Sequence, residues 1–303
     1  STMHIQFEES EERNIIISRC RHGVFAYNAN GLIGSFLFIY GEWAEPEVEL
    51  LSRLVHPGDV VVDVGAHIGT ETVPLAKRVG SSGHVIAFEP QKHLFHLLCT
   101  NVTLNGLGNV TPVHGGVGES DSWMEVPTQH YGKPGNFGAV TLRPVPIDNL
   151  NKGFSVDSVN QVQCWRLDDF LAGDERVQLI KIDVEGMELE VLCGAQELIT
   201  RCRPIIYCEM NQKTTGDALI AHLRSLDYRL YWHGFQGFNV GNFKGNDENV
   251  TGTRGDANVL CLPNESSITV DGLHPLDNFD QVHELFPGLI AKGPLAREYS
   301  SSF

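Results

Sequence analysis

The run Val62-Asp63-Val64-Gly65-Ala66-His67-Ile68-Gly69 marks the point where a hydrophobic segment turns at glycine and enters a helical pattern. The segment that leads into it, Asp59 to Val64, is largely apolar, which is typical of a strand covered on both faces of a sheet. Glycine allows the backbone to approach a ligand closely and to adopt conformations that are closed to other residues. We therefore expect a strand, a ligand-binding turn and a helix in succession.

The same alternation of short apolar segments and helical patterns continues along the chain, and it predicts a mostly parallel, doubly wound α/β sheet. The predicted strands are Asp59 to Val64, His84 to Glu89, Asn109 to His114, Val177 to Asp183 and Pro204 to Glu209, closed by an antiparallel pair at Tyr228 to His233 and Ala257 to Pro263. The predicted helices are Glu71 to Val79, a helix that begins at Pro90 and ends at Asn105-Gly106, Met187 to Thr200, and Gly216 to Leu226.

Residues 119–163 interrupt this rhythm, because they are rich in glycine, proline and asparagine. Strand-like pieces at Trp123 to Val126, Gly138 to Leu142 and Gln161 to Trp165 predict a β-hairpin insertion that selects the substrate. We therefore divide the chain into an N-terminal segment (1–57), a core (58–263) and a C-terminal extension (264–303). The extension is expected to pack on the core or to join an oligomer interface.

The spacing of the glycines in the turn separates two classes of nucleoside-binding protein. The NAD fingerprint reads GxGxxG, whereas Gly65 and Gly69 stand four residues apart in a DxGxxxG pattern without a middle glycine. Glu89 ends the next predicted strand, twenty residues beyond Gly69, where an acidic side chain can accept both ribose hydroxyls of a nucleoside. Together these features predict a site for S-adenosylmethionine, whose amino-acid part would pass over the turn.

The residues expected to hold this cofactor surround the turn and the neighbouring strand ends. They are Asp63, Gly65, Ala66, His67, Gly69, Glu89, Pro90 and Asp183, with Gly116 and Val117 near the adenine edge. A plain turn is the alternative interpretation for Gly116 and Val117. Two further segments could close the site, Glu42-Trp43 from the N-terminal side and Gly135 to Gly138 from the insertion. A core tryptophan beside a surface acid, and a simple loop, are the alternatives for these two.

The amino-acid composition limits which binding partners and which cellular compartment are expected for this protein. The formal net charge of −16 argues against a nucleic-acid backbone or an anionic membrane surface as the main partner. The seven cysteines include no CxxC pair, which suits neither a zinc site nor a disulfide framework. No stretch approaches the length of roughly 20 apolar residues that spans a bilayer, and the beginning of the sequence lacks the regions of a signal peptide. We expect a cytoplasmic protein with neither a nucleic-acid nor a membrane partner.

The segment from Leu179 to Leu192 reads LIKIDVEGMELEVL, and Gly194-Ala195 follow it. It resembles the signature of FkbM-type methyltransferases, roughly KIDVEGxExxVLxGA. The resemblance extends over about residues 40 to 263, because further similar segments lie at Gly41 to Trp43, Arg166 to Phe170, Pro204 to Glu209 and Asn258 to Pro263. The chain departs from the family at His67, where asparagine is common.

The resemblance implies a Rossmann-like, seven-stranded class I methyltransferase fold. It also implies an S-adenosylmethionine-dependent methyltransferase that most often methylates a hydroxyl of a sugar or secondary metabolite. The expected partner is accordingly a small-molecule or glycan hydroxyl acceptor. Asp183 is the first candidate for the base that takes the hydroxyl proton, and Glu185 and Glu209 follow it. For Asp183 a role in holding the cofactor, and for Glu185 a structural role in the turn, remain open.

Three alternatives remain open at this stage. Oxygen ligands from Asp183, Glu209 and Asn211 could hold Mg²⁺ and lower the pKa of an acceptor hydroxyl. A nicotinamide-dependent oxidoreductase would share Glu89 but should show the GxGxxG spacing. A scaffold that binds a nucleoside cofactor without catalysis would show affinity without turnover. Nucleic-acid methylation is disfavoured further, because Glu209 to Gln212 does not form an (N/D)PPY tetrapeptide.

Overall fold

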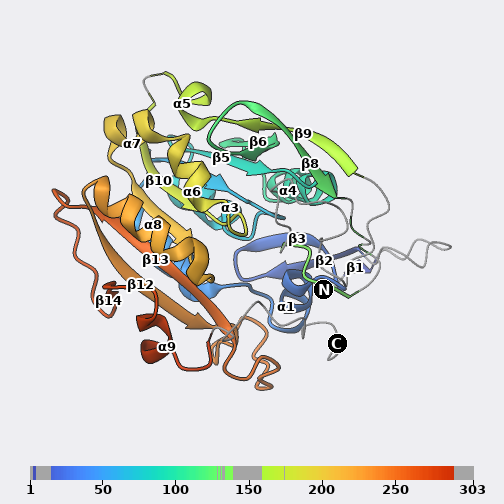
Figure 1. Ribbon diagram of the computed structural model, residues 1–303. Coiled ribbons are helices and arrows are strands. Elements are labelled where there is room, and N and C mark those ends of the chain that lie inside the picture. The colour runs from blue at the N-terminus through green and yellow to red at the C-terminus, as the bar shows by residue number, and fades with distance from the viewer. Residues whose placement is uncertain are drawn as a thin grey trace.

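A mixed sheet of eight strands organises the residues that the computed structural model describes, which are 3–4, 15–127, 129, 131, 134–138, 159–173 and 175–289 (Figure 1). The strand order is β14-β12-β13-β11-β10-β4-β5-β6. Their bounds are β4 Val60–Val64, β5 His84–Glu89, β6 Val110–His114, β10 Val177–Ile182, β11 Ile205–Glu209, β12 Tyr228–Gln236, β13 Gly255–Pro263 and β14 His274–Pro275. The order reverses direction between β4 and β10, so the predicted doubly wound, Rossmann-like α/β sheet is confirmed.

The pairing of the strands agrees with the sequence pattern. The strands β11, β10, β4, β5 and β6 run parallel to one another. Strand β13 pairs antiparallel with β11, and β12 and β13 close the sheet as an antiparallel pair. The sheet exceeds the predicted seven strands by the two-residue β14, which pairs with the edge strand β12. Apolar residues of the tail, Leu276 and Phe279, are buried in the core beside it, and their burial brings β14 to this edge.

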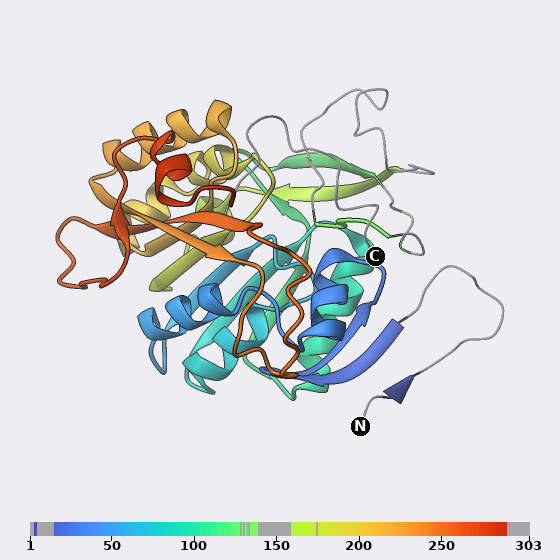
Figure 2. The same ribbon diagram turned by 90° about the horizontal axis from the view of Figure 1, so that it is seen from below.

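Helices cover both faces of the sheet. Figure 2 shows helices coloured yellow to orange on one side of the strands and blue helices on the other. Side chains of a strand point alternately to the two faces of the sheet. On one face Val62, Ile180 and Ile206 pack in a core with helices α6, α7 and α8. On the other face Val61, Leu179 and Ile205 pack in a second core with helices α2 and α3. The helices are α2 Glu45–Leu54, α3 Thr72–Val79, α4 Lys92–Leu104, α5 Leu167–Phe170, α6 Glu188–Cys193, α7 Gln196–Cys202 and α8 Lys213–Ser225.

Several helix boundaries differ from the prediction. The expected helix from Met187 to Thr200 is two helices, because the chain breaks at Gly194-Ala195, and the carboxylate of Asp168 accepts hydrogen bonds from backbone amides in the first turn of α7. The prediction that Pro90 is the first helical residue is wrong. Gln91 adopts an extended backbone conformation, and α4 begins at Lys92. Helix α8 begins at Lys213, three residues before the predicted Gly216.

The N-terminal segment and the insertion form two small sheets beside the large one. The first contains β1 Met3–His4, β2 Ile15–Cys20 and β3 Gly23–Asn28, and α1 Leu32–Ile39 follows it. The second contains β7 Gly116–Val117, β9 Val159–Trp165 and β8 Ser122–Pro127 in that order. Strands β8 and β9 confirm the strand-like pieces predicted at 123–126 and 161–165. The third predicted piece, 138–142, lies outside the described residues except for Gly138.

The described part of the tail packs against the large sheet through β14 and α9 Gln281–Leu285. Phe279 contacts the fully buried indole of Trp232 edge to face, and Val282 and Leu289 join the same core. Up to Leu289 the C-terminal segment is therefore an extension of the core. Among the described residues no helix combines the length and the apolar character that crossing a membrane requires.

Candidate functional site

A cavity of about 970 Å³, counted with the part that opens to solvent, lies where β4, β5, β10 and β11 end and where β13 begins. Ligands of open α/β sheets bind at this edge. Among the described residues seven carboxylates and a single lysine line it, namely Glu47, Glu71, Glu89, Asp183, Glu185, Glu209, Asp256 and Lys181. The cavity therefore carries a large excess of acidic groups over basic ones.

The glycine turn forms one wall of the cavity. Gly65 has a φ of +83°, and a Cβ at this position would lie 1.8 Å from the carbonyl oxygen of Asp183. The amides of Gly65 and Ala66 both donate to the carbonyl oxygen of Phe88, at 3.0 and 2.9 Å, so the turn is fastened to the end of β5. Only glycine satisfies both the positive φ and the close approach of β10.

Glu89 connects the turn to the beginning of α4. Its Oε2 accepts a hydrogen bond from the amide of His67 (2.9 Å) and its Oε1 accepts one from the amide of Gln91 (2.8 Å). Burial raises the pKa of this carboxyl to about 7, against the effect of the two amides. Each carboxylate oxygen has a second lone pair, so Glu89 can still accept hydroxyl groups from the cavity.

Asp63 lies below the cavity floor. Its Oδ2 accepts a hydrogen bond from the Thr72 hydroxyl (2.6 Å), and its Oδ1 lies 3.5 Å from Nζ of Lys181, its register partner on β10. Lys181 is also 3.9 Å from Glu71 and 3.8 Å from Asp183. Burial alone would lower the pKa of Lys181, but these three carboxylates and that of Glu47 outweigh the effect of burial and raise the pKa well above its usual range. Asp63 thus binds the lysine that supports the floor, and its side chain does not line the cavity.

Asp183, Glu185 and Glu209 come together at the ends of β10 and β11. One carboxylate oxygen from each lies within 4.8 Å of the others. The side chain of Asp183 is 44% exposed. Burial raises the pKa of Glu185 to about 8, with a further contribution from Asp183, and raises that of Glu209 well above its usual range, with a contribution from Glu185. Asn211, predicted beside them, donates its amide to Glu209 and lies outside the cavity wall.

The other predicted cofactor residues lie in different places. His67 and Pro90 line the cavity. Burial lowers the pKa of His67 to about 3, with a smaller contribution from the positive charge of Lys181, so the imidazole is neutral. Ala66 and Gly69 face Leu98 and its neighbours below α4, away from the cavity. Gly116 and Val117 form the strand β7 beside β9, where Gly116 lies against Met124 and Val117 is buried in the large core, and neither lines the cavity.

Several lining residues were not assigned from the sequence. Glu47 on α2 and Asp256 at the beginning of β13 are far apart in the sequence but line the same cavity. Lys181 also lines it, and although Lys181 belongs to the segment that resembles the family signature, no role was assigned to its side chain from the sequence. Burial raises the pKa of Asp256 to about 7 and that of Glu47 well above its usual range. The positions of Glu47 and Asp256 carry no local signal, because their approach depends on how α2 and β13 pack.

Both segments that could close the site contribute to it. Trp43 lines the cavity, with Leu32 and Ile33, although Glu42 does not. From the insertion, Asn136 and Gly138 line it, and the carbonyl oxygen of Phe137 accepts a hydrogen bond from Nε2 of Gln91 (2.6 Å). The cavity therefore has an acidic floor at the sheet edge and an apolar side formed by the N-terminal segment.

The sequence profile of the methyltransferase FkbM domain matches residues 63–230. Methyltransferase 1 of Beauveria bassiana is 32% identical over 152 residues, which cover 45% of this chain and 58% of that protein. The hexuronic acid methyltransferase AglP of Haloferax volcanii is 30% identical over 150 residues, which cover 48% of this chain and 54% of that protein. The chain thus spans somewhat more than half the length of these relatives.

Among solved structures, the methyltransferase FkbM from Methylobacillus flagellatus KT superposes with a TM-score of 0.44 at 19% identity and covers 67% of this chain and 43% of that one. The range 63–230 contains Gly65, Glu89, Asp183 and Glu209, whereas Glu47 and Asp256 lie outside it. The matched domain therefore includes the turn and the floor of the cavity but not its N-terminal side.

Proposed function

Since the chain belongs to the FkbM methyltransferase family, we propose that it transfers a methyl group from S-adenosylmethionine to a hydroxyl oxygen of a small molecule or glycan. One observation carries this proposal. The glycine turn with Glu89 and the exposed carboxylate of Asp183 open into the same cavity. A nucleoside-binding wall and a candidate base are therefore adjacent.

The residues of the wall fit this cofactor. Gly65 leaves the turn free of a side chain, and Glu89 keeps acceptor capacity on both oxygens for ribose hydroxyls. S-adenosylmethionine supplies a methyl group bound to a sulfonium cation, and its amino group is a second cation. The excess of carboxylates over lysine in the cavity favours such a ligand electrostatically.

Asp183 is the group we assign to the acceptor proton. Its side chain is the most open of the three clustered carboxylates, and Lys181 lies 3.8 Å from its Oδ2. Glu185, whose pKa burial raises to about 8, holds a proton near neutral pH and can orient the acceptor by donating a hydrogen bond. Burial also raises the pKa of Glu209 beside it. An acceptor oxygen held about 3 Å from the methyl carbon, with its proton on Asp183, completes the arrangement for transfer.

The first test is calorimetric titration with S-adenosylhomocysteine, with NADH as the control ligand. Micromolar affinity for S-adenosylhomocysteine alone is the expected result. Binding of NADH alone would replace the proposal by a nicotinamide enzyme, and binding of neither would remove the cofactor assignment. An acceptor screen with labelled methyl donor then separates an enzyme from a non-catalytic scaffold.

The second test addresses the base. Asp183→Asn should leave affinity for S-adenosylhomocysteine within a few fold and lower turnover by roughly 10²–10⁴-fold. Asp169→Asn is the matched control, because Asp169 is an exposed aspartate that pairs with Arg166 outside the cavity. Turnover of the Asp183→Asn variant equal to that of this control would assign the proton to another group.

A metal-assisted transfer is the second candidate, and the approach of Asp183, Glu185 and Glu209 to within 4.8 Å favours it. Carboxylate oxygens are the ligands that Mg²⁺ prefers. Asn211, the third ligand expected from the sequence, donates to Glu209, so Glu185 takes its place in the set. Loss of turnover with a chelator, restored by Mg²⁺, together with calorimetric Mg²⁺ binding that Glu185→Gln abolishes, would establish this variant of the mechanism. Turnover unaffected by the chelator would exclude it.

The acceptor class and the compartment are further parts of the proposal. The name of AglP describes transfer to a hexuronic acid, which supports a sugar as one acceptor class for this chain. All seven cysteines are free thiols, four of them buried, which supports a reducing compartment such as the cytoplasm.

A further inference from the structure

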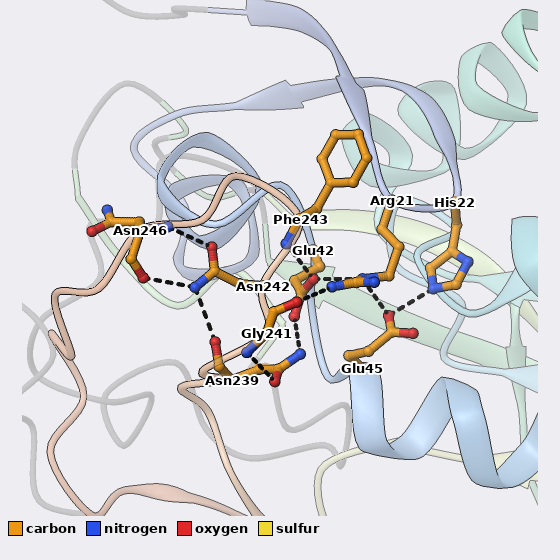
Figure 3. A network of polar contacts seen from close by, with 9 residues as sticks. All are labelled: Arg21, His22, Glu42, Glu45, Asn239, Gly241, Asn242, Phe243 and Asn246. Carbon is orange, nitrogen blue, oxygen red and sulfur yellow. Dashed lines mark hydrogen bonds and ion pairs between the residues drawn. The ribbon is translucent and has the colours of Figure 1, made fainter.

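A buried carboxylate joins three distant parts of the chain beside the cavity. Glu42 is 5% exposed and lies between α1 and α2. Its Oε2 accepts hydrogen bonds from Nε of Arg21 (2.6 Å) and the amide of Phe243 (2.8 Å), and its Oε1 accepts one from Nδ2 of Asn239 (2.7 Å). Figure 3 shows these donors converging on Glu42 from the β2–β3 turn and from the β12–β13 loop.

Further contacts hold the same three segments together. The side chain of Arg21 also donates to the carbonyl oxygen of Gly241, and its backbone amide donates to that of Gly41 (2.8 Å). His22 lies 2.6 Å from the carboxylate of Glu45. We call Arg21, Glu42, Asn239 and Phe243 the Glu42 clip.

The β12–β13 loop is also fastened to α1. The hydroxyl of Tyr40 donates to the carbonyl oxygen of Glu248 (2.7 Å) and accepts from the amide of Val250 (3.1 Å). Farther along the chain the loop leads into β13, which begins at Gly255. Movement of the loop relative to the turn that contains Glu42 would therefore displace the first residues of β13.

Two of the three segments joined by the clip lead into residues that line the cavity. Trp43 follows Glu42 directly and packs edge to face on Phe36, with ring centroids 4.9 Å apart. Glu47 lies in the first turn of α2, and its Oε2 accepts a hydrogen bond from Nδ2 of Asn258 on β13 (3.0 Å). Asp256 lies on the same strand, two residues earlier. Trp43, Glu47, Asp256 and Asn258 all line the cavity.

We propose that Glu42 is a positioning residue for the acceptor half of the cavity. By holding the β12–β13 loop against the turn between α1 and α2, it sets Trp43 and Glu47 opposite Asp256 and Asn258. The inference rests on the proposed function, because that function places the acceptor beside Asp183, in the cavity that these residues also line. Among the described residues, no hydrogen bond or ion pair joins the clip to the glycine turn or to Glu89, the part of the cavity we assign to the nucleoside.

The substitution Glu42→Gln tests this role with little change in volume. A glutamine has one acceptor oxygen, and its NH₂ group would face at least one of the three donors, so the clip loses a charge-assisted hydrogen bond and gains an unpaired donor. The loop and the turn should then separate. Asp168→Asn is the matched control, because Asp168 is also a buried carboxylate that accepts two backbone amides and one arginine, but it lies on α5 away from the cavity.

The measurement uses this chain, residues 1–303, labelled with 5-fluorotryptophan, with the ¹⁹F resonance of Trp43 assigned by Trp43→Phe. Glu42→Gln should shift or broaden the Trp43 resonance and leave the other three tryptophan resonances in place. Its dissociation constant for S-adenosylhomocysteine should remain within about threefold of wild type. Asp168→Asn should lower the melting temperature similarly without moving the Trp43 resonance. Asn239→Ala, which removes one of the three donors to Glu42 and the acceptor of the Gly241 amide, should shift it in the same direction by less.

Two results would overturn the proposal. An unchanged Trp43 resonance in a folded Glu42→Gln protein would make the clip a structural contact without influence on the cavity. A loss of S-adenosylhomocysteine affinity of tenfold or more would mean that the clip supports the whole site. If Glu42→Gln does not fold, Asn239→Ala decides by the same criteria. Failure of wild type to bind S-adenosylhomocysteine would remove the proposed function alone, since the resonance of Trp43 is compared in the ligand-free protein.

Discussion

At the scale of single residues, Gly65 shows how one position combines a backbone constraint with a packing constraint. Gly65→Ala would need a φ of +83° and a Cβ that overlaps the backbone of Asp183, so we expect it to destabilise the fold by more than about 4 kcal/mol. Gly80→Ala is the control, because Gly80 also has a positive φ (+68°) but open space around it, and it should cost roughly 1–3 kcal/mol. Chemical denaturation measures both. Equal costs would mean that β10 can move away from the turn.

Glu89 is the second residue whose role can be measured alone. Glu89→Gln keeps the size of the side chain but replaces one acceptor oxygen by a donor that faces the amide of His67 or Gln91. We expect affinity for S-adenosylhomocysteine to fall by about 1–3 kcal/mol, as for loss of a charged hydrogen bond. Calorimetry is the measurement, and Glu125→Gln on the exposed side of β8 is the control. Affinity unchanged from that control would show that Glu89 shapes the turn without contacting the nucleoside.

At the scale of elements, the neighbouring strands β4 and β10 place opposite charges in register beneath the cavity. Lys181 opposes Asp63 across the two strands and is almost fully buried. Lys181→Met leaves buried carboxylates without their cation and should destabilise the protein by about 3–5 kcal/mol. Lys213→Met, which removes an exposed partner of Asp280, should change stability by less than about 1 kcal/mol. Denaturant unfolding of the two variants tests the difference, and similar values would show that the carboxylates carry protons in place of the pairing.

The elements themselves were predictable where the local pattern was strong. Strands such as β5, His84–Glu89, are continuous apolar segments bounded by turn residues, and their predicted limits agree with the structure. The single helix expected from Met187 to Thr200 was wrong, because apolar periodicity continues across Gly194 while the chain bends there to meet Gly118. A tertiary contact of this kind has no counterpart in the periodicity of one helix.

At the scale of the whole molecule, the acidic cavity makes stability depend on pH. In the folded protein burial raises the pKa of Glu89 and Asp256 to about 7 and that of Glu185 to about 8, whereas the unfolded chain has values near 4. Between these limits the folded state binds more protons than the unfolded state, so its stability falls as pH rises. His67 and His233, with pKa values lowered to about 3 and 4, act in the opposite direction only below about pH 6.5.

We therefore expect the free energy of unfolding of the cofactor-free protein to fall between pH 6.5 and 8.5, by on the order of 3 kcal/mol. Urea unfolding at several pH values measures it. Glu185→Gln, which removes the group that titrates highest, should flatten the curve. A free energy that stays constant or rises over this interval would mean that these carboxyls are ionised throughout.

The sequence by itself determined the sheet, the glycine turn and the nucleoside-type spacing of Gly65, Gly69 and Glu89. These features depend on local signals, namely apolar periodicity, turn chemistry and distance along the chain. Only the tertiary structure decided that Asp63 lies under the floor with Lys181, and that Glu47 and Asp256 share the cavity. The physical reason is that strand register and helix packing bring together side chains far apart in sequence, and no local pattern records which of them will meet.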